Sequence, residues 1–281
     1  MPPTARRRQL EVWGDPIQHS RSPALHTAAY AVLDVPWSYG RREVSADTFD
    51  RELSRLDASF RGLSLTYPLK ACGFAASGTR DRRAELTGAV NTLLLESEGF
   101  RGFNTDIGGI VRALSEAGIE SVDRVRVVGA GATASSAIVA VAELGAHHVE
   151  VVARRPAAVA PLQALGDALG VVVLPVPFTA PGHAPVPLTI STLPGDAEIS
   201  DAAAAALAES GGMLMDVVYG HWPTVLAQAW QHAGGDARSG LAMLLHQALL
   251  QVRIFASGDP DVPVDDEAAV LAAMRRAIMG D

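Results

Sequence analysis

The chain has 281 residues, of which 48% are apolar and 19% are charged, so it should fold as a globular protein rather than remain disordered. This length is too great for one compact core of ordinary size and suits two domains of roughly 100–150 residues each. The formal net charge of −8 argues against a protein that binds nucleic acids or anionic membranes, because such proteins normally display a basic face.

Nothing in the sequence predicts export or membrane insertion. Arg6, Arg7 and Arg8 make the start of the chain basic, but polar and acidic residues follow where a signal peptide would need an apolar stretch. No run of about 18 apolar residues occurs, and the single cysteine, Cys72, excludes an intrachain disulfide. A cytoplasmic protein is therefore expected, and its oligomeric state, monomer or homodimer, stays open.

Strand-like and helix-like segments alternate along the chain, which predicts an α/β fold with largely parallel sheets. The first unit is expected to contain a strand near Gln9–Trp13, a helix from Ser22 to about Leu33, a strand near Trp37–Arg42, a helix near Asp47–Leu56, a strand near Arg61–Thr66, and a hairpin over Ala89–Leu95 and Phe100–Asn104. An amphipathic helix from about Asp106 to Gly118 then leads to the second unit.

The second unit should continue as strand, helix and strand in the Rossmann manner. We expect strands at Val125–Val128, Val149–Val152, Val171–Leu174, Leu188–Ser191 and Met213–Val217, and helices at Ala134–Leu144 and Ala157–Leu169. A proline-rich loop over Pro175 to Pro187, a surface helix over Ala202–Ala206, and last helices near Leu241–Phe255 and Asp266–Met279 complete the prediction. Residues 1–107 with 240–281 form one expected domain, and residues 108–239 form the other.

The peptide Gly129-Ala130-Gly131-Ala132-Thr133-Ala134 lies directly between a predicted strand and a predicted helix, which is the setting of a dinucleotide-binding turn. Gly129 permits the tight turn, Gly131 lets the backbone approach a pyrophosphate, and Ala134 allows close packing of helix on strand. The anion would lie on the helix N-terminus, which makes Gly129, Gly131 and Ala132 candidate cofactor-binding residues. An ordinary glycine turn is the alternative.

The end of the next strand indicates which dinucleotide is preferred. An NAD site usually has an acidic residue there, which accepts the ribose 2′-hydroxyl. Here the strand is followed by Ala153-Arg154-Arg155-Pro156, and Glu150 lies inside the strand, where it should face away. The two guanidinium groups could pair with a 2′-phosphate, so Arg154 and Arg155 favour NADP over NAD. Solvated loop charges are the alternative.

A second anion site is predicted between the first strand and the first helix. Ser22 followed by Pro23 is expected to be an N-cap with proline at the first helical position. The Ser20 and Ser22 hydroxyls, with the positive end of the helix, could hold a small carboxylate; the cap alone is the alternative. His19 and His26 are too isolated to predict a metal site, so a structural role is expected for both.

Lys70, at the end of the peptide Ser64 to Lys70, and Asp106, in Asn104-Thr105-Asp106, form a candidate acid–base pair. A lysine in a pocket, held by one carboxylate, can pass a proton to or from a substrate hydroxyl if burial and its partner tune it suitably. Most lysines and aspartates are solvated surface charges, so the prediction depends on the motifs around the pair.

Together these peptides resemble the shikimate dehydrogenase family over nearly the full length of the chain. Five motifs occur in the family's order: Gly14 to His26, Ser64 to Lys70, Gly88 to Thr92, Asn104 to Asp106, and Gly240 to Gln247. The resemblance implies an N-terminal α/β substrate domain and a Rossmann-like domain that binds NADP. It also implies final helices that pack back on the N-terminal domain, and a cleft between domains that can open and close.

The resemblance further implies a role for each candidate residue. Ser20 and Ser22 would hold the substrate carboxylate, and the ring hydroxyls would be surrounded by Thr66, Lys70, Asn91, Asp106 and Gln247. Tyr219 would lie where substrate and nicotinamide meet, and Gly240 would be close to the nicotinamide. The implied reaction is NADPH-dependent reduction of 3-dehydroshikimate to shikimate, on the route to chorismate and the aromatic amino acids, with Lys70 as the general acid and, in reverse, as the base.

The sequence departs from the family at three peptides. The usual Asn-Val-Thr before the lysine is Ser64-Leu65-Thr66, the common Gly-Ala pair of the dinucleotide loop is Ala132-Thr133, and the frequent Asn-Arg-Thr phosphate clamp is Ala153-Arg154-Arg155. The last change removes two polar contacts to a 2′-phosphate, although Arg155 adds a charge. Two other functions stay open: a dehydrogenase of quinate or another shikimate relative that uses NAD, and a non-catalytic regulator that senses a dinucleotide.

Overall fold

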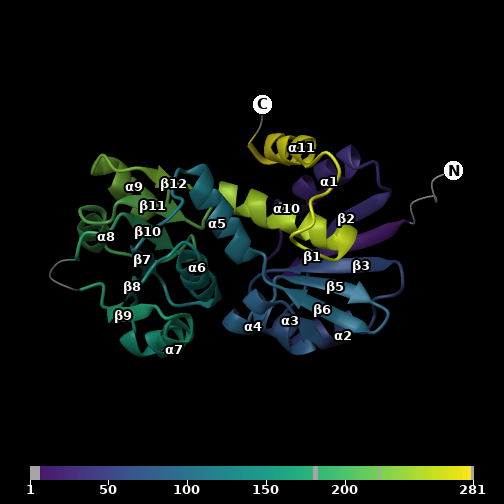
Figure 1. Ribbon diagram of the computed structural model, residues 1–281, viewed down its shortest axis with the longest axis horizontal. Coiled ribbons are helices and arrows are strands. Elements are labelled where there is room, and N and C mark those ends of the chain that lie inside the picture. Colours follow the sequence, from purple (N-terminus) through teal and green to yellow (C-terminus); the bar gives the residue numbers. More distant parts are fainter. Residues whose placement is uncertain (1–6, 180–182, 221, 280–281) are drawn as a thin grey trace. The chain divides into compact units, whose positions relative to one another are not determined.

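The computed structural model describes residues 7–179, 183–220 and 222–279, which fold into two units (Figure 1). The first unit contains the chain up to Gly109 together with the chain from Leu245 onward, and the second contains Ile110–Leu244. Arg6 of the basic N-terminal segment lies outside the described residues. None of the helices in the described ranges is both long enough and apolar enough to span a bilayer.

The first unit is built on a mixed sheet. Its described strands are β1 (Arg8–Gly14), β2 (Trp37–Glu43), β3 (Phe60–Leu65), β4 (Thr79–Arg80), β5 (Thr92–Glu96) and β6 (Gly99–Phe103), in the spatial order β2-β1-β3-β5-β6-β4. β1 is parallel to β2 and β3, whereas β5 is antiparallel to both β3 and β6. The carboxyl ends of β1, β3 and β6 therefore meet the start of β5 at one edge of the sheet.

Both ends of the chain contribute helices to the first unit. These are α1 (Ser22–Val32), α2 (Phe49–Leu53), α3 (Lys70–Ala76), α4 (Arg82–Thr87), α11 (Glu267–Met279) and most of α10 (Leu241–Ser257). α11 packs beside α1 (Figure 1), and Arg21 Nη1 donates to the Ile278 carbonyl at 2.7 Å. The final helices thus pack back on the N-terminal unit, as the resemblance implied.

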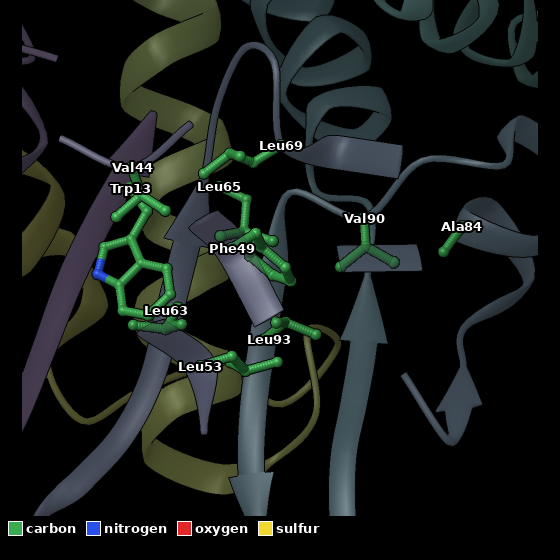
Figure 2. Close-up of a cluster of buried hydrophobic side chains, with 10 residues drawn as sticks. All are labelled: Trp13, Val44, Phe49, Leu53, Leu63, Leu65, Leu69, Ala84, Val90 and Leu93. Atoms are coloured by element: carbon green, nitrogen blue, oxygen red, sulfur yellow. The ribbon is translucent and has the colours of Figure 1, made fainter. Parts of the chain in front are cut away.

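One hydrophobic cluster of the first unit holds the start of α3 in place. Figure 2 shows its ten buried side chains, Trp13, Val44, Phe49, Leu53, Leu63, Leu65, Leu69, Ala84, Val90 and Leu93. Leu69, which directly precedes Lys70, is fully buried in this cluster. Because burial of a leucine stabilises a fold by ~1.5–3 kcal/mol, the position from which the Lys70 side chain projects is well fixed.

Phe255 of α10 packs directly on β3 at Gly62, which has no side chain. A Cβ at Gly62 would lie 2.3 Å from Cε1 of Phe255, so any larger residue would clash with this ring of α10. Arg61 Nε strengthens this contact by donating to the Phe255 carbonyl at 2.9 Å. The close approach brings Gln251 of α10 within 2.8 Å of the Ser64 hydroxyl.

The second unit contains a parallel sheet with helices on both faces. Its described strands are β7 (Arg124–Val128), β8 (His148–Val152), β9 (Val172–Val176), β10 (Leu188–Ser191), β11 (Met213–Asp216) and β12 (Ala237–Arg238), in the order β12-β11-β10-β7-β8-β9. α6 (Ala132–Glu143) and α7 (Ala160–Leu169) lie on one face, and α8 (Asp201–Ala208) and α9 (Val225–His232) on the other (Figure 1). The strand order reverses between β7 and β10, where ligands bind in such sheets.

The structure confirms the predicted fold class and corrects several element boundaries. The expected Asp47–Leu56 helix is a 3₁₀ turn followed by the short α2, and the hairpin begins at Thr92 rather than at Ala89. The sequence reading missed α3, α4, α9, β4 and β12, all of which are too short to show a periodic pattern. α8 is not purely a surface helix, because Ala204 and Leu207 are buried. Residues 180–182 of the predicted proline-rich loop lie outside the described ranges.

The two units divide the chain after Gly109 and Leu244, close to the expected boundaries after residues 107 and 239. α5 (Asp106–Glu116) and α10 both cross these divisions, since each begins in one unit and ends in the other. Asp106 therefore belongs to the first unit even though its helix continues into the second.

Candidate active site

The candidate substrate residues of the first unit share one sheet edge. Ser20 and Ser22 follow β1, Lys70 follows β3, Asn91 precedes β5, and Asp106 follows β6. The loops after β1 and β3 run side by side, because the Asp15 N–H donates to the Tyr67 carbonyl at 3.0 Å. A Cβ at Gly14 would lie 2.4 Å from Cγ2 of the half-buried Thr66, so these loops are also packed tightly.

Lys70 and Asp106 form an ion pair with a distance of 2.5 Å between Nζ and Oδ2. The pair is shielded from solvent, since the side chains are only 16% and 8% exposed. Asp106 is the first residue of α5, where the helix dipole favours a negative charge. Lys70 is the first residue of α3, where the dipole disfavours a positive charge, so the carboxylate is what holds the ammonium group there.

Asn91 joins this ion pair to Gln247, another predicted substrate residue. Its Nδ2 donates to Asp106 Oδ1 at 2.8 Å and to Thr105 Oγ1 at 2.9 Å. Its Oδ1 accepts from the Thr105 N–H at 2.9 Å, and Thr105 Oγ1 lies 3.4 Å from Gln247 Oε1, to which it donates. Lys70, Asn91, Asp106 and Gln247 thus form one buried network connected through Thr105.

The prediction that Ser22 caps α1 is wrong. Arg21 occupies the N-cap position with helical angles, φ −90° and ψ −4°, and Ser22 is already the first helical residue. The Ser22 side chain is buried, and its hydroxyl lies near the Tyr39 hydroxyl. The Ser20 hydroxyl instead accepts from the Ser22 N–H, at 3.4 Å. The helix N-terminus and both hydroxyls remain together, but in a different arrangement from the expected cap.

The candidate cofactor residues of the second unit also gather at one sheet edge. Gly129 follows β7, Arg154 follows β8, Tyr219 follows β11, and Gly240 follows β12. Because these strands are parallel, their carboxyl ends lie along the same edge. This arrangement is typical of a nucleotide-binding crevice.

The turn after β7 has the features that a pyrophosphate requires. Gly129 has a φ of +112°, and a Cβ there would lie 2.5 Å from Thr192 Oγ1, so both its conformation and its space demand glycine. A Cβ at Gly131 would meet no atom within 4 Å, which leaves open space beside the backbone. α6 begins at Ala132, and no described side chain caps its N-terminus, so its first N–H groups can bind an anion.

The two predicted arginines lie differently after β8. Both are exposed, but Arg154 lines a cavity of about 400 Å³ together with Phe178, Glu198 and Ser200. Glu150 does not reach this end of the strand, since its Oε2 accepts from Arg126 Nε at 3.2 Å and Nη2 at 3.0 Å. Its carboxylate is therefore used inside the unit, as its place within the strand suggested.

Tyr219 and Gly240 lie on two chain segments that pack together. The Gly240 N–H donates to the Val218 carbonyl at 3.0 Å, and a Cβ at Gly240 would lie 2.1 Å from the Val217 carbonyl oxygen. Asp216 holds the segment that carries Tyr219, because it accepts from the Val218 N–H at 3.1 Å and from Thr224 Oγ1 at 2.6 Å. Burial raises the pKa of Asp216, and these hydrogen bonds oppose the rise.

Comparison with known proteins places this arrangement in a family. The shikimate dehydrogenase substrate-binding domain matches residues 12–93. Shikimate dehydrogenase (NADP(+)) from Methylobacterium radiotolerans is 34% identical over 261 residues, which cover 85% of this chain and 87% of the relative. The enzyme of the same name from Rubrobacter xylanophilus is 32% identical, with 95% and 94% covered. The chain belongs to the shikimate dehydrogenase family.

Solved structures of shikimate dehydrogenases have the same fold. The crystal structure of the Mycobacterium tuberculosis enzyme matches with a TM-score of 0.84 at 37% identity, covering 95% of this chain and 98% of that one. Shikimate 5-dehydrogenase from Thermus thermophilus, in complex with NADP(H) and shikimate, matches with a TM-score of 0.78 at 28% identity, covering 96% and 100%. The resemblance that the five sequence motifs indicated is confirmed.

Three residues of this shikimate dehydrogenase family site were missed by the sequence reading. Thr92 Oγ1 donates to Asn91 Oδ1 at 2.8 Å, Thr105 joins Asn91 to Gln247, and Gln251 contacts the backbone of Asn91. Thr92 and Thr105 lie inside recognised motifs but were given no role of their own. The sequence could have indicated Gln251, because it lies one helical turn after Gln247 and thus on the same face of a largely apolar helix.

Acid should destabilise the fold through His26, which has the expected structural role. Its ring is fully buried and stacked on Tyr39 with centroids 4.0 Å apart, and burial lowers its pKa from 6.5 to about 3. Between these pH values the unfolded chain binds a proton that the folded chain does not, so the free energy of unfolding should fall by up to about 1.4 kcal/mol per pH unit as the pH decreases. Urea unfolding from pH 7 to 4 should show a shallower pH slope for His26→Phe than for the wild type; parallel slopes would contradict this assignment.

Proposed function

We propose that this chain is an NADP-dependent shikimate dehydrogenase, which reversibly reduces 3-dehydroshikimate to shikimate. The observation that carries the proposal is the shielded ion pair between Lys70 and Asp106, with 2.5 Å between Nζ and Oδ2. The names of the relatives from M. radiotolerans and R. xylanophilus, and the NADP(H) and shikimate in the T. thermophilus structure, support it. The product belongs to the route to chorismate and the aromatic amino acids.

On the substrate side, the first unit offers two kinds of contact. Ser20 and Ser22, at the N-terminus of α1, would bind the carboxylate, since hydroxyls and a positive helix end both favour an anion. Thr66, Lys70, Asn91, Asp106 and Gln247 would surround the ring hydroxyls. These assignments rest on the shared sheet edge and on the buried network through Asn91.

On the cofactor side, the residues of the second unit fit NADPH. Gly129, Gly131 and Ala132 would hold the pyrophosphate at the uncapped start of α6, and Arg154 with Arg155 would pair with the 2′-phosphate. Tyr219 and Gly240, on their two packed segments, would lie near the nicotinamide. Bound NADPH would supply the hydride that reduces the ring ketone.

The protein's own chemical contribution would be a proton transfer at Lys70. As the ketone oxygen becomes an alkoxide, Lys70 Nζ would donate a proton to it, and in the reverse direction Lys70 would accept a proton from the hydroxyl. Asp106 would hold the ammonium group in position and bind the adjacent hydroxyl. Their low exposure supports this role, because a hydrogen bond to a charged group is stronger where water is excluded.

One assay tests both the reaction and the cofactor. Purified protein is mixed with 3-dehydroshikimate and either NADPH or NADH, and oxidation of the cofactor is followed by absorbance. We expect rapid oxidation of NADPH and slower oxidation of NADH. The reverse reaction, with shikimate or quinate as the substrate, separates a shikimate dehydrogenase from a dehydrogenase of quinate. Absence of oxidation of either cofactor would contradict the proposal and favour a non-catalytic role.

Arg154→Ala should weaken the binding of NADPH but not the binding of NADH. Loss of a charge-assisted hydrogen bond to a phosphate costs about 1.5–3 kcal/mol, so the KM for NADPH should rise by roughly 10–100-fold while the KM for NADH stays unchanged. Arg155→Ala is the matched comparison, with a smaller expected effect because only Arg154 is among the described residues that line the cavity after β8. Steady-state kinetics with both cofactors give the two KM values. An equal rise in the KM for NADPH and the KM for NADH would count against a contact between Arg154 and the 2′-phosphate.

A further inference from the structure

Gln251 is a buried amide at the centre of the first unit, 2% exposed and four residues after Gln247 in α10. Its Nε2 donates to the Asn91 carbonyl at 3.2 Å and to Thr92 Oγ1 at 2.9 Å. Its Oε1 accepts from Ser64 Oγ at 2.8 Å and lies 3.3 Å from His26 Nε2. One side chain from the C-terminal part of the chain thus contacts β3, the start of β5 and α1.

The neighbours of Gln251 determine how its amide is oriented. A backbone carbonyl can only accept, so the NH₂ group must face Asn91, and Oε1 must face Ser64 and His26. His26 then carries its proton on Nε2, which leaves Nδ1 to accept from the Tyr30 hydroxyl at 3.1 Å. Both donors and both lone pairs of the amide are used, so its loss would leave several buried groups without partners.

On one side, hydrogen bonds lead from Gln251 to the ion pair. Thr92 Oγ1 accepts from Gln251 and donates to Asn91 Oδ1 at 2.8 Å. Asn91 Nδ2 donates in turn to Asp106 Oδ1 at 2.8 Å, and the other oxygen of this carboxylate holds Lys70. Gln251 therefore constrains both the backbone and the side chain of Asn91.

On the other side, hydrogen bonds lead from Gln251 to Tyr39, which lies beside the start of α1. Ser64, which donates to Gln251, accepts from the Tyr39 hydroxyl at 2.6 Å. The Tyr39 hydroxyl in turn lies near the Ser22 hydroxyl. A series of hydrogen bonds between buried side chains thus connects Tyr39, beside Ser22, with Asn91, and Gln251 lies in its middle.

We propose that Gln251 is a positioning residue, which sets the separation between the carboxylate end and the ring-hydroxyl end of the substrate site. It acts on Asn91 through Thr92, and on α1, which carries Ser22, through its contact with His26 and through Ser64 and Tyr39. This inference rests on the proposed function, because it assigns a role within that substrate site. Every residue in this series of hydrogen bonds belongs to the first unit. Loss of Gln251 should therefore change substrate recognition and not cofactor binding.

The sharpest test uses Thr92, which carries the connection from Gln251 to the Asn91 side chain. Thr92→Val keeps the shape of this fully buried residue and removes its hydroxyl, whereas Thr92→Ser keeps the hydroxyl. With shikimate as the substrate, Thr92→Val should raise the KM for shikimate by about tenfold, as expected for one lost buried hydrogen bond, and leave the KM for NADP⁺ unchanged. Thr92→Ser should restore the wild-type KM for shikimate.

Gln251→Met provides the direct test, and Tyr30→Phe its control. Gln251→Met removes the hydrogen bonds on both sides, those toward Asn91 and those toward Tyr39. It should therefore lower kcat/KM for shikimate more than Thr92→Val does. Tyr30→Phe removes a hydroxyl from the same buried cluster on the far side of His26, so both KM values should stay at the wild-type level. If Gln251→Met does not fold, the Thr92 variants decide alone.

The outcomes separate this inference from the proposed function. An active wild type, together with Thr92 and Gln251 variants that lose thermal stability but keep the wild-type KM for shikimate, would overturn the positioning role alone. A wild type that neither oxidises shikimate nor binds it in calorimetry would overturn the proposed function, and the inference with it.

Discussion

Lys70→Ala should lower the turnover of 3-dehydroshikimate reduction by ~10²–10⁴-fold, because the variant lacks the group that protonates the developing alkoxide. Substrate binding should change far less, since Ser20, Ser22, Asn91 and Gln247 remain. Steady-state and single-turnover rates with saturating NADPH measure the loss, and the substrate KM reports binding. Near-normal turnover in this variant would remove Lys70 from the chemistry.

Two features allow the effect of Lys70 to be measured separately from other effects. Lys70 is the only lysine among the chain's 23 lysine and arginine residues, so amine chemistry and lysine-specific isotope labels report on this side chain without interference from another lysine. Lys70→Arg is the matched variant, because arginine keeps the positive charge beside Asp106 but does not release a proton in proteins. We expect it to be almost as slow as Lys70→Ala, and recovery of its turnover would mean that charge alone is sufficient.

Glu150→Leu should destabilise the second unit by about 3–5 kcal/mol, because it leaves the charge of Arg126 buried without a counter-charge. The Arg126 side chain is fully buried, while Glu150 is 15% exposed. Arg126 also donates to Ser210 Oγ at 3.1 Å and to the Ala184 carbonyl at 2.6 Å, but neither acceptor carries a negative charge. Scanning calorimetry should show a melting temperature lower by on the order of 10 °C.

Replacing both Arg126 and Glu150 completes a double-mutant cycle. The double variant Arg126→Met with Glu150→Leu should be more stable than Glu150→Leu alone, since apolar side chains of similar size leave no buried charge unpaired. Arg126→Met alone should fall between them, because Glu150 is nearer to solvent than Arg126. A double variant as unstable as the worse single variant would show that packing, and not the unpaired charge, causes the loss.

Local patterns in the sequence were enough for the cofactor turn. Gly129, Gly131 and Ala132 are separated by fixed short spacings between a strand and a helix, and this spacing directly determines the backbone geometry. The same holds for β7 and β8 of the second unit, which are short valine-rich segments, and valine favours strands. The N-cap prediction at Ser22 failed because it depends on the backbone angles of Arg21, which residue type alone does not fix.

Long-range contacts explain most of what was missed. Lys70 and Asp106 are 36 residues apart, and only the order of the family's motifs suggested that they would meet. Gln251 lies 160 residues from Asn91, and their contact depends on the space that Gly62 leaves for Phe255. Arg126 and Glu150 are paired by the parallel register of β7 and β8, in which they are direct neighbours. No short-range pattern encodes such contacts.

The discontinuous first unit has a consequence for how the protein is made. The ribosome releases residues up to Gly109 first, then the whole second unit, and only afterwards the segment from Leu245 that supplies most of α10, with Gln247 and Gln251, and α11. Until that segment emerges, the face of β3 that receives Phe255 has no cover. The second unit can therefore finish folding before the first unit is complete. If translation stops before Leu245, the product contains an incomplete first unit joined to a complete second unit.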